Sequence, residues 1–205
     1  MNIRLIHSIR VLMIIKREEK NNSQETRSFV RCFWRNHLIF KFLELMKFVS
    51  EEVIDAIIDA LEENSDEQYE KQMEAFAEAQ PVLFAWLFSE EFELLNDDEK
   101  GYLQYLALIA WKSVVEVNGP MDAVSEQEIG EAEENNYEIL EASTAKKFRD
   151  RLDPFFDDSP QEDLLAFAEE AVLESEDDPD SLVSKEGREP IFIALKTIVD
   201  VLTTD

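Results

Sequence analysis

The chain is rich in signals that start helices and has almost none that form strands. In a capping box, a Ser or Thr side chain accepts a hydrogen bond from the backbone N–H three residues on, and a Glu or Gln there bonds back. Three such boxes begin at Ser65, Ser125 and Ser159, the last with a proline at the first helical position. No stretch alternates with the two-residue period of a strand, and the 205 residues include only four glycines. We therefore predict an all-α fold of seven or eight helices over residues 46–205.

The remaining helices can be placed from apolar periodicity and from the residues that stop a helix. Pro81 fits the first turn of an apolar helix, Val82 to Leu95. Ser50 is expected to cap a helix that runs through Leu61. The other expected helices are a long one from Asn96 or Asp97 to Asn118, a short one from Ser143 or Thr144 to Pro154, and a last one over most of 184–203.

Ten residues recur in similar form 84 positions apart. Leu108 to Val117 and Phe192 to Val201 are identical at five of ten positions, and most of the other pairs are conservative. A shorter match between Ala75–Glu78 and Ala166–Glu169 has an offset of 91. Buried helices all draw on Ala, Ile, Val and Leu, so a chance resemblance is the alternative to a true duplication.

We interpret these matches as an internal duplication of a three-helix unit. The copies would cover about 50–118 and 143–203, with a connecting helix over about 126–142. The fold class is then a multi-helix bundle or a short α-solenoid. The period matches no common repeat family, so no named solenoid class is predicted.

Charge divides the chain into two parts near Met46. The sequence has 47 acidic and 20 basic residues, a net charge of -27. Residues 1–45 hold nine Lys or Arg and four Glu, whereas residues 46–205 hold 11 basic and 43 acidic residues. We predict a basic N-terminal extension over 1–45, outside the native product or poorly ordered, and an acidic all-helical domain over 46–205. The alternative for its aromatic and basic end, Phe29–Val49, is a helix that binds a membrane surface or a partner.

The acidic domain lacks the residue types of common catalytic sites. Both histidines, His7 and His37, and the only cysteine, Cys32, precede residue 46. This excludes Ser-His-Asp triads, Cys-His dyads, the usual zinc sites and Glu-x-x-His di-iron sites from the domain. No apolar run is long enough to span a membrane or follows the pattern of a secretory signal. We expect a cytoplasmic, non-enzymatic protein, with no oligomeric state defined by the sequence.

The acidic surface favours one class of partner. Negative charge repels nucleic-acid phosphates and anionic lipid, and it attracts basic proteins and divalent cations. Our first hypothesis is a protein–protein interaction module that binds a basic partner, without a cofactor and without direct nucleic-acid binding. The alternatives are a Mg²⁺-dependent phosphohydrolase with a carboxylate site, which needs neither His nor Cys, and a nucleic-acid mimic.

An acidic loop is the candidate metal site. It could hold Ca²⁺ through oxygen ligands, but it lacks the glycine at position six and the acid at position twelve of an EF-hand. The alternative is a hydrated, charged connection. Its candidate ligands are Glu174, Glu176, Asp177, Asp178 and Asp180.

Two groups of basic residues are candidate binding sites in the acidic domain. Lys112 and Lys196 occupy equivalent positions in the two copies, so they could share a ligand between them, or each could pair with the acid four residues on. A basic cluster could bind a phosphate or an acidic partner, or it could neutralise neighbouring acids. That cluster consists of Lys146, Lys147, Arg149 and Arg151.

Overall fold

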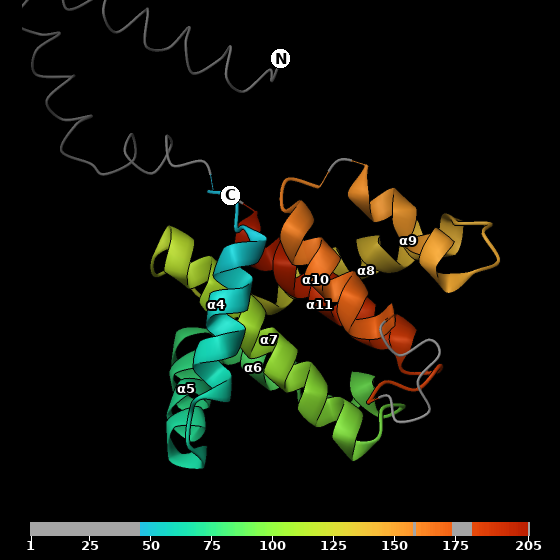
Figure 1. The fold of residues 1–205 in the computed structure, drawn as a ribbon. Coiled ribbons are helices and arrows are strands. Elements are labelled where there is room, and N and C mark those ends of the chain that lie inside the picture. The colour runs from blue at the N-terminus through green and yellow to red at the C-terminus, as the bar shows by residue number, and fades with distance from the viewer. Residues whose placement is uncertain (1–45, 158, 174–181, 205) are drawn as a thin grey trace, which may run out of the picture. The chain divides into compact units, whose positions relative to one another are not determined.

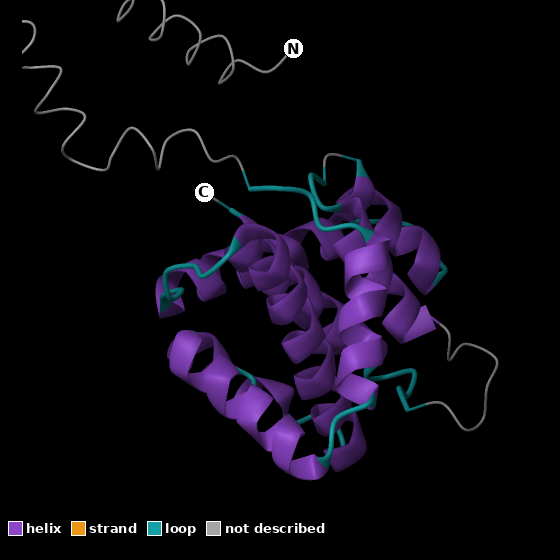
Figure 2. Cartoon of the chain, turned by 60° about the vertical axis from the view of Figure 1, so that its left-hand side comes forward, coloured by secondary structure: helices purple, strands orange, loops and turns teal. Residues whose placement is uncertain are grey.

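A computed structural model describes residues 46–157, 159–173 and 182–204. The chain divides into Met1–Leu45 and Met46–Asp205, and all described residues belong to the second unit. The predicted N-terminal extension therefore lies outside the described residues. Where the structure describes the chain, it forms eight α-helices, one 3-10 helix and no strand, which confirms the all-α prediction (Figures 1 and 2). The elements are α4 (Glu51–Glu62), α5 (Asp66–Ala79), α6 (Pro81–Trp86), η1 (Glu90–Phe92), α7 (Asp97–Asn118), α8 (Glu126–Ala142), α9 (Phe148–Phe156), α10 (Glu162–Leu173) and α11 (Arg188–Thr203).

The two helices that carry the recurring ten-residue motif form the centre of the bundle. Helix α11 packs against α7, α8 and α10 (Figure 1). Six consecutive residues of α7, 106–111, are buried, and so are five of α11, 191–195. At 3.6 residues per turn, such a run buries every side of a helix. The motif therefore serves packing.

The outer helices contribute one apolar face each. Helix α4 lies on α7 and buries Ile54 and Leu61, which are seven residues, or two turns, apart. Helix α5 contacts α6 and α7 and buries Phe76, whose ring stacks on Trp111 with 5.0 Å between centroids. Helix α8 packs on α11 and buries Ile129 and Leu140. Its buried Asn136 adds a polar contact, donating to Thr197 Oγ1 at 3.3 Å and to Asp200 Oδ2 at 3.0 Å.

Two of the three predicted capping boxes are confirmed, at Ser65 and Ser125. The third is wrong, because α10 begins at Glu162 and Gln161 has another role. The Gln161 side chain is buried; its Oε1 accepts from Val49 N at 2.9 Å, and its Nε2 donates to Lys47 O at 3.1 Å. The Ser159 hydroxyl still accepts a local hydrogen bond, from Gln161 N at 3.3 Å, two residues on and not three.

The predicted helix from Val82 to Leu95 is also wrong. Helix α6 ends at Trp86, and η1 follows after a turn. The break lets the Trp86 ring meet the Phe92 ring edge to face, with 5.1 Å between centroids. In a continuous helix these residues would be about 9 Å apart along the axis and on different sides.

Both ends of α9 differ from prediction, whereas the last helix is confirmed. Helix α9 continues past Pro154 to Phe156, because Phe155 is buried against Phe192 with 5.2 Å between ring centroids. Its N-cap is Lys147, not Ser143 or Thr144. Helix α11, Arg188–Thr203, fills most of 184–203, as predicted.

The internal duplication stays a prediction. The supposed copies do not pair their helices in the same way: α4 packs on α7, whereas its counterpart α9 packs chiefly on α10 and α8. Helix α10 lies along α11, whereas α5 has a slighter contact with α7.

Candidate functional site

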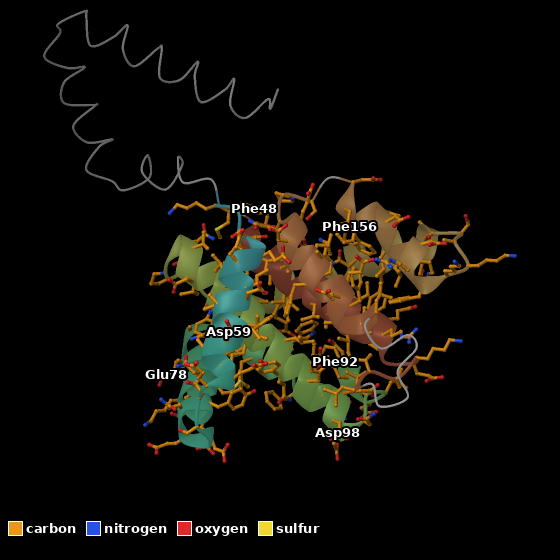
Figure 3. All side chains as sticks on the ribbon, in the orientation of Figure 1. Phe48, Asp59, Glu78, Phe92, Asp98 and Phe156 are labelled. Carbon is orange, nitrogen blue, oxygen red and sulfur yellow. The ribbon has the colours of Figure 1, made fainter. Side chains whose placement is uncertain are left out.

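Carboxylates cover the outer faces of three helices. Residues 51–79, which form α4, α5 and the turn between them, include eleven acidic residues and one basic residue, Lys71. Helix α8 includes seven acidic residues and no basic one. Most of these side chains are exposed, and Figure 3 labels Asp59 on α4 and Glu78 on α5 among them. These faces can offer many acceptors to cationic groups.

The structure spreads the predicted basic cluster over separate contacts. Arg151 binds Glu189 of α11 at 2.9 Å and donates to Leu140 O at 3.5 Å. Arg149 pairs with Glu169 of α10 at 3.5 Å. Lys146 and Lys147 are exposed in the connection before α9. The two arginines thus neutralise neighbouring acids, as the alternative interpretation expects, and the four residues do not converge on one anion.

Arg149 also lines an open cavity of about 350 Å³ on α9 and α10. Its other lining residues include Glu169, Glu170 and Leu173. One guanidinium group stands against two carboxylates there, so the cavity offers no excess positive charge to a phosphate.

The two predicted lysines bind different neighbours. Lys112 Nζ donates to Gln72 Oε1 of α5 at 2.7 Å instead of pairing with Glu116. Lys196 pairs with Asp200 in its own helix, and Asp200 also accepts from α8. The intrahelical pair therefore forms at Lys196 and not at Lys112.

The candidate calcium loop, Glu174–Asp180, lies outside the described residues. Among the residues that the structure does describe, no group of three or more His, Cys, Asp or Glu side chains is placed to hold a metal ion. The helices of this same part of the chain include none that is both long and apolar enough to cross a membrane.

A buried glutamate that the sequence analysis missed ties the start of α7 to the start of α11. The Glu99 carboxylate accepts from Asn96 N at 2.9 Å and from Ser184 N at 2.8 Å, and Glu99 is 2% exposed. Burial alone would raise the pKa of Glu99, but the hydrogen bonds from Ser184 and Asn96 outweigh burial and lower it. A Cβ on Gly187 would lie 2.3 Å from Glu99 Oε1, so the carboxylate fills the space beside that glycine. The Asn-x-x-Glu pattern at Asn96–Glu99 was a sequence signal for the helix cap. No sequence pattern indicated the hydrogen bond between Glu99 and Ser184.

A second missed group lies where η1, α8 and α11 meet. Burial, and then the nearby Glu91 carboxylate, raise the pKa of Glu133 to about 7. Burial also raises the pKa of Tyr137, as do the carboxylates of Glu133, Glu189 and Glu91. The Trp86 indole N–H donates to Glu91. Three carboxylates therefore gather around one tyrosine, and of these Glu189 is held by Arg151.

No family model, no curated protein and no solved structure matches the chain.

Proposed function

We propose that residues 46–205 are a non-enzymatic protein-interaction module whose acidic outer faces bind a basic protein. One observation carries this proposal: the outer faces of α4, α5 and α8 are crowded with carboxylates, while Lys71 is the only basic residue in those helices. Lys71 pairs with Glu67 of its own helix at 2.7 Å. The unbalanced carboxylates would bind Lys and Arg side chains of a partner.

The basic residues elsewhere in the domain support the same conclusion. Arg149, Arg151 and Lys196 are engaged in ion pairs within the chain. Residues 46–205 hold 43 acidic residues against 11 basic ones, so the net field of the domain is strongly negative. Such a field speeds the encounter with a cationic partner and repels nucleic acids. A cytoplasmic location and a repeated architecture remain expectations that accompany this proposal.

The test is the affinity of the whole chain for an oligolysine peptide at 50, 150 and 500 mM NaCl. Two triple variants each neutralise one acidic face: Glu70, Glu74 and Glu78→Gln on α5, and Glu131, Glu134 and Glu138→Gln on α8. A third triple variant removes the same number of charges elsewhere and is the control: Asp153→Asn, Asp157→Asn and Glu186→Gln. We expect affinity to fall steeply with salt, and at least one helix variant to lose clearly more affinity than the control. If all three variants lost the same affinity for oligolysine, binding would depend only on the net charge of the chain, and the proposal would be contradicted.

A further inference from the structure

Exposed apolar side chains gather in one connection of the bundle. Five large apolar side chains are exposed among the described residues, and three of them lie within 81–95: Val82 at 37%, Phe88 at 57% and Leu94 at 86%. Single exposed apolar residues are common, but three within one stretch of 15 residues single this segment out as the place to look for an apolar contact with a partner. This segment is α6, η1 and the turns around them, the part that did not form the continuous helix expected from its sequence.

The most prominent exposed ring is held in place from inside the domain. Phe88 contacts Phe84 with 5.0 Å between ring centroids, Phe84 meets Phe76 edge to face at 5.7 Å, and Phe76 stacks on Trp111. A continuous row of rings thus runs from the core to the surface. An apolar contact on Phe88 would cost little conformational entropy, because its position is already fixed by packing.

The same segment is unbalanced in charge. The chain has no Lys or Arg between Lys71 and Lys100, and none between Lys112 and Lys146. The first gap contains the whole apolar segment and the second contains α8. Exposed Glu90, Glu91 and Glu93 lie between Phe88 and Leu94 in sequence.

One carboxyl group of α8 has a pKa raised first by burial and then by the Glu91 carboxylate of this acidic segment. Glu133 is partly buried close to Glu91 of η1 and has a pKa of about 7. The charged or titratable groups around it are Glu91 on η1, Tyr137 on α8 and, at the start of α11, Glu189 with its partner Arg151 from α9. A cationic side chain between Glu91 and Glu133 would favour both ionised carboxylates.

We propose that the segment 81–95 and the adjoining side of α8 bind a basic amphipathic helix of a partner protein. The partner's apolar side chains would pack on Phe88 and Leu94, and a Lys or Arg would bind between Glu91 and Glu133. The described residues offer no sheet edge for an added strand, so an apolar helix face is the recognition mode that this surface fits. This inference rests on the proposed function and gives it a location.

Binding would then release protons. The free Glu133 carboxyl is about half protonated at pH 7, and a bound cation lowers its pKa, so the complex forms more readily as the pH rises from about 5.5 to 8. An apolar contact alone would not produce this pH dependence.

The probe is an 18-residue helical peptide of Leu and Lys with leucines at three- and four-residue spacing. A scrambled peptide of the same composition controls for charge. Affinities are measured by titration calorimetry with the whole chain and with Leu94→Ser, with Phe88→Ser plus Leu94→Ser, and with Glu133→Gln. Leu182→Ser removes an exposed apolar side chain elsewhere in the sequence and is the matched control.

We expect the amphipathic peptide to bind more tightly than the scrambled one. The variant with both Phe88→Ser and Leu94→Ser should bind the amphipathic peptide about tenfold or more weakly than the unmodified chain. Leu94→Ser alone should lose part of that affinity, and Leu182→Ser should lose less than about twofold. Titration at pH 7 in two buffers with different ionisation enthalpies should show release of up to about half a proton per complex, which Glu133→Gln abolishes.

Two outcomes overturn the inference, and they differ in what else they affect. If oligolysine still binds while the serine variants and Leu182→Ser match the unmodified chain, the docking site is wrong and the proposed function stands. If neither oligolysine nor the amphipathic peptide binds at 50 mM NaCl, the proposed function fails and the docking site fails with it.

Discussion

Glu99 shows how one buried carboxylate can join two helix starts. It completes the N-terminal cap of α7 and, through Ser184, fixes the backbone that leads into α11. The pKa of Glu99 is lower in the folded than in the unfolded state, so its ionised carboxylate contributes to the free energy of unfolding. This contribution is fully present above the unfolded pKa of about 4.3 and is lost as the pH falls through the folded pKa. The ionised carboxylate therefore stabilises the fold at neutral pH.

Replacing Glu99 with Gln should remove this contribution. An amide has one acceptor oxygen instead of two, so one of the two backbone N–H groups loses its partner. We expect a loss of about 1–3 kcal/mol in the free energy of unfolding at pH 7 and a smaller loss at pH 3. Urea denaturation at both pH values measures this. The neighbouring exposed Asp98→Asn controls for charge near the helix start, and a loss as large as that of Glu99→Gln would refute the assigned role.

Glycine substitutions should have opposite effects at different positions. Gly187→Ala would place a methyl group 2.3 Å from Glu99 Oε1 and should destabilise the fold by about 1–3 kcal/mol. Gly101→Ala and Gly130→Ala lie on exposed helix positions with no atom within 4 Å of the new Cβ, and they should stabilise it by about 0.5–1 kcal/mol. Thermal unfolding of the three variants tests this, and a stabilising Gly187→Ala would contradict the described Glu99 position.

Ionisation of Glu133 should lower the free energy of unfolding of the unbound domain as the pH rises. Its folded pKa of about 7 exceeds the unfolded value, so the folded state binds more protons, and the free energy of unfolding falls between about pH 4.5 and pH 7. Glu133→Gln should remove this decline and stabilise the domain by about 1 kcal/mol at pH 8, with little change at pH 4.5. Unfolding curves at both pH values measure it, with exposed Glu134→Gln as the control.

At the scale of elements, two buried glutamines fasten connecting segments to the helices. Gln161 holds the backbone at Lys47 and Val49, and Gln80 does the same for Asp122 and Val124. Each amide uses its oxygen as an acceptor and its nitrogen as a donor, so it replaces a pair of backbone hydrogen bonds. Neither side chain could be exchanged for an isosteric acid without losing the donor.

Gln161→Glu should therefore loosen the segment before α4. The carboxylate cannot donate to Lys47 O, and it is buried next to that carbonyl oxygen, so we expect a loss of about 2–3 kcal/mol in stability. Hydrogen exchange at the Val49 amide should become faster. Gln127→Glu on the exposed side of α8 is the matched control; an unchanged Val49 exchange rate in Gln161→Glu would contradict the role.

Local sequence patterns predicted the elements that depend on local interactions. The boxes at Ser65 and Ser125 form, and the recurring motif lies in the two central helices, because both features depend on neighbours within a turn or on simple burial. The failures at Ser159 and at Val82–Leu95 have another cause. There, Gln161 and Trp86 bind residues that no periodicity can pair with them.

The candidate site follows the same division. An acidic surface could be predicted from composition. The ion pairs of Arg149 and Arg151 with neighbouring acids could be predicted as well, because a surface this acidic needs internal counter-charges. The approach of Glu133 to Glu91 could not, since it depends on how α8 lies against η1. The same holds for the exposure of Phe88 and Leu94, which depends on where the helix breaks after Trp86.

At the scale of the whole molecule, self-repulsion is the main electrostatic effect. The net charge of the chain is -27, and salt screens repulsion between exposed carboxylates at the Debye length of about 10 Å in 0.1 M salt. The folded state concentrates this charge more than the unfolded state does. Salt should therefore stabilise the fold.

The midpoint of thermal unfolding should rise by about 3–8 °C between 20 and 500 mM NaCl. KCl should act equally, because the effect is screening and not binding of one ion. The combined α5 and α8 glutamine variants should start from a higher midpoint and gain less from salt. A midpoint that falls with salt would show that attractive pairs, such as Arg151 with Glu189, outweigh the repulsion.

The central position of α11 has a consequence for the order in which the fold can be completed. The ribosome makes α11 after α7, α8 and α10, yet those three helices bury their inner faces against it. About 85 residues separate the ends of α7 and α11, which at about 5–20 residues per second is on the order of ten seconds of synthesis. During that interval the inner face of α7 has no α11 to cover it. The contact of α7 with α11 can therefore form only after α11 has been made, and in the meantime the dense negative charge of the chain would keep neighbouring nascent chains apart.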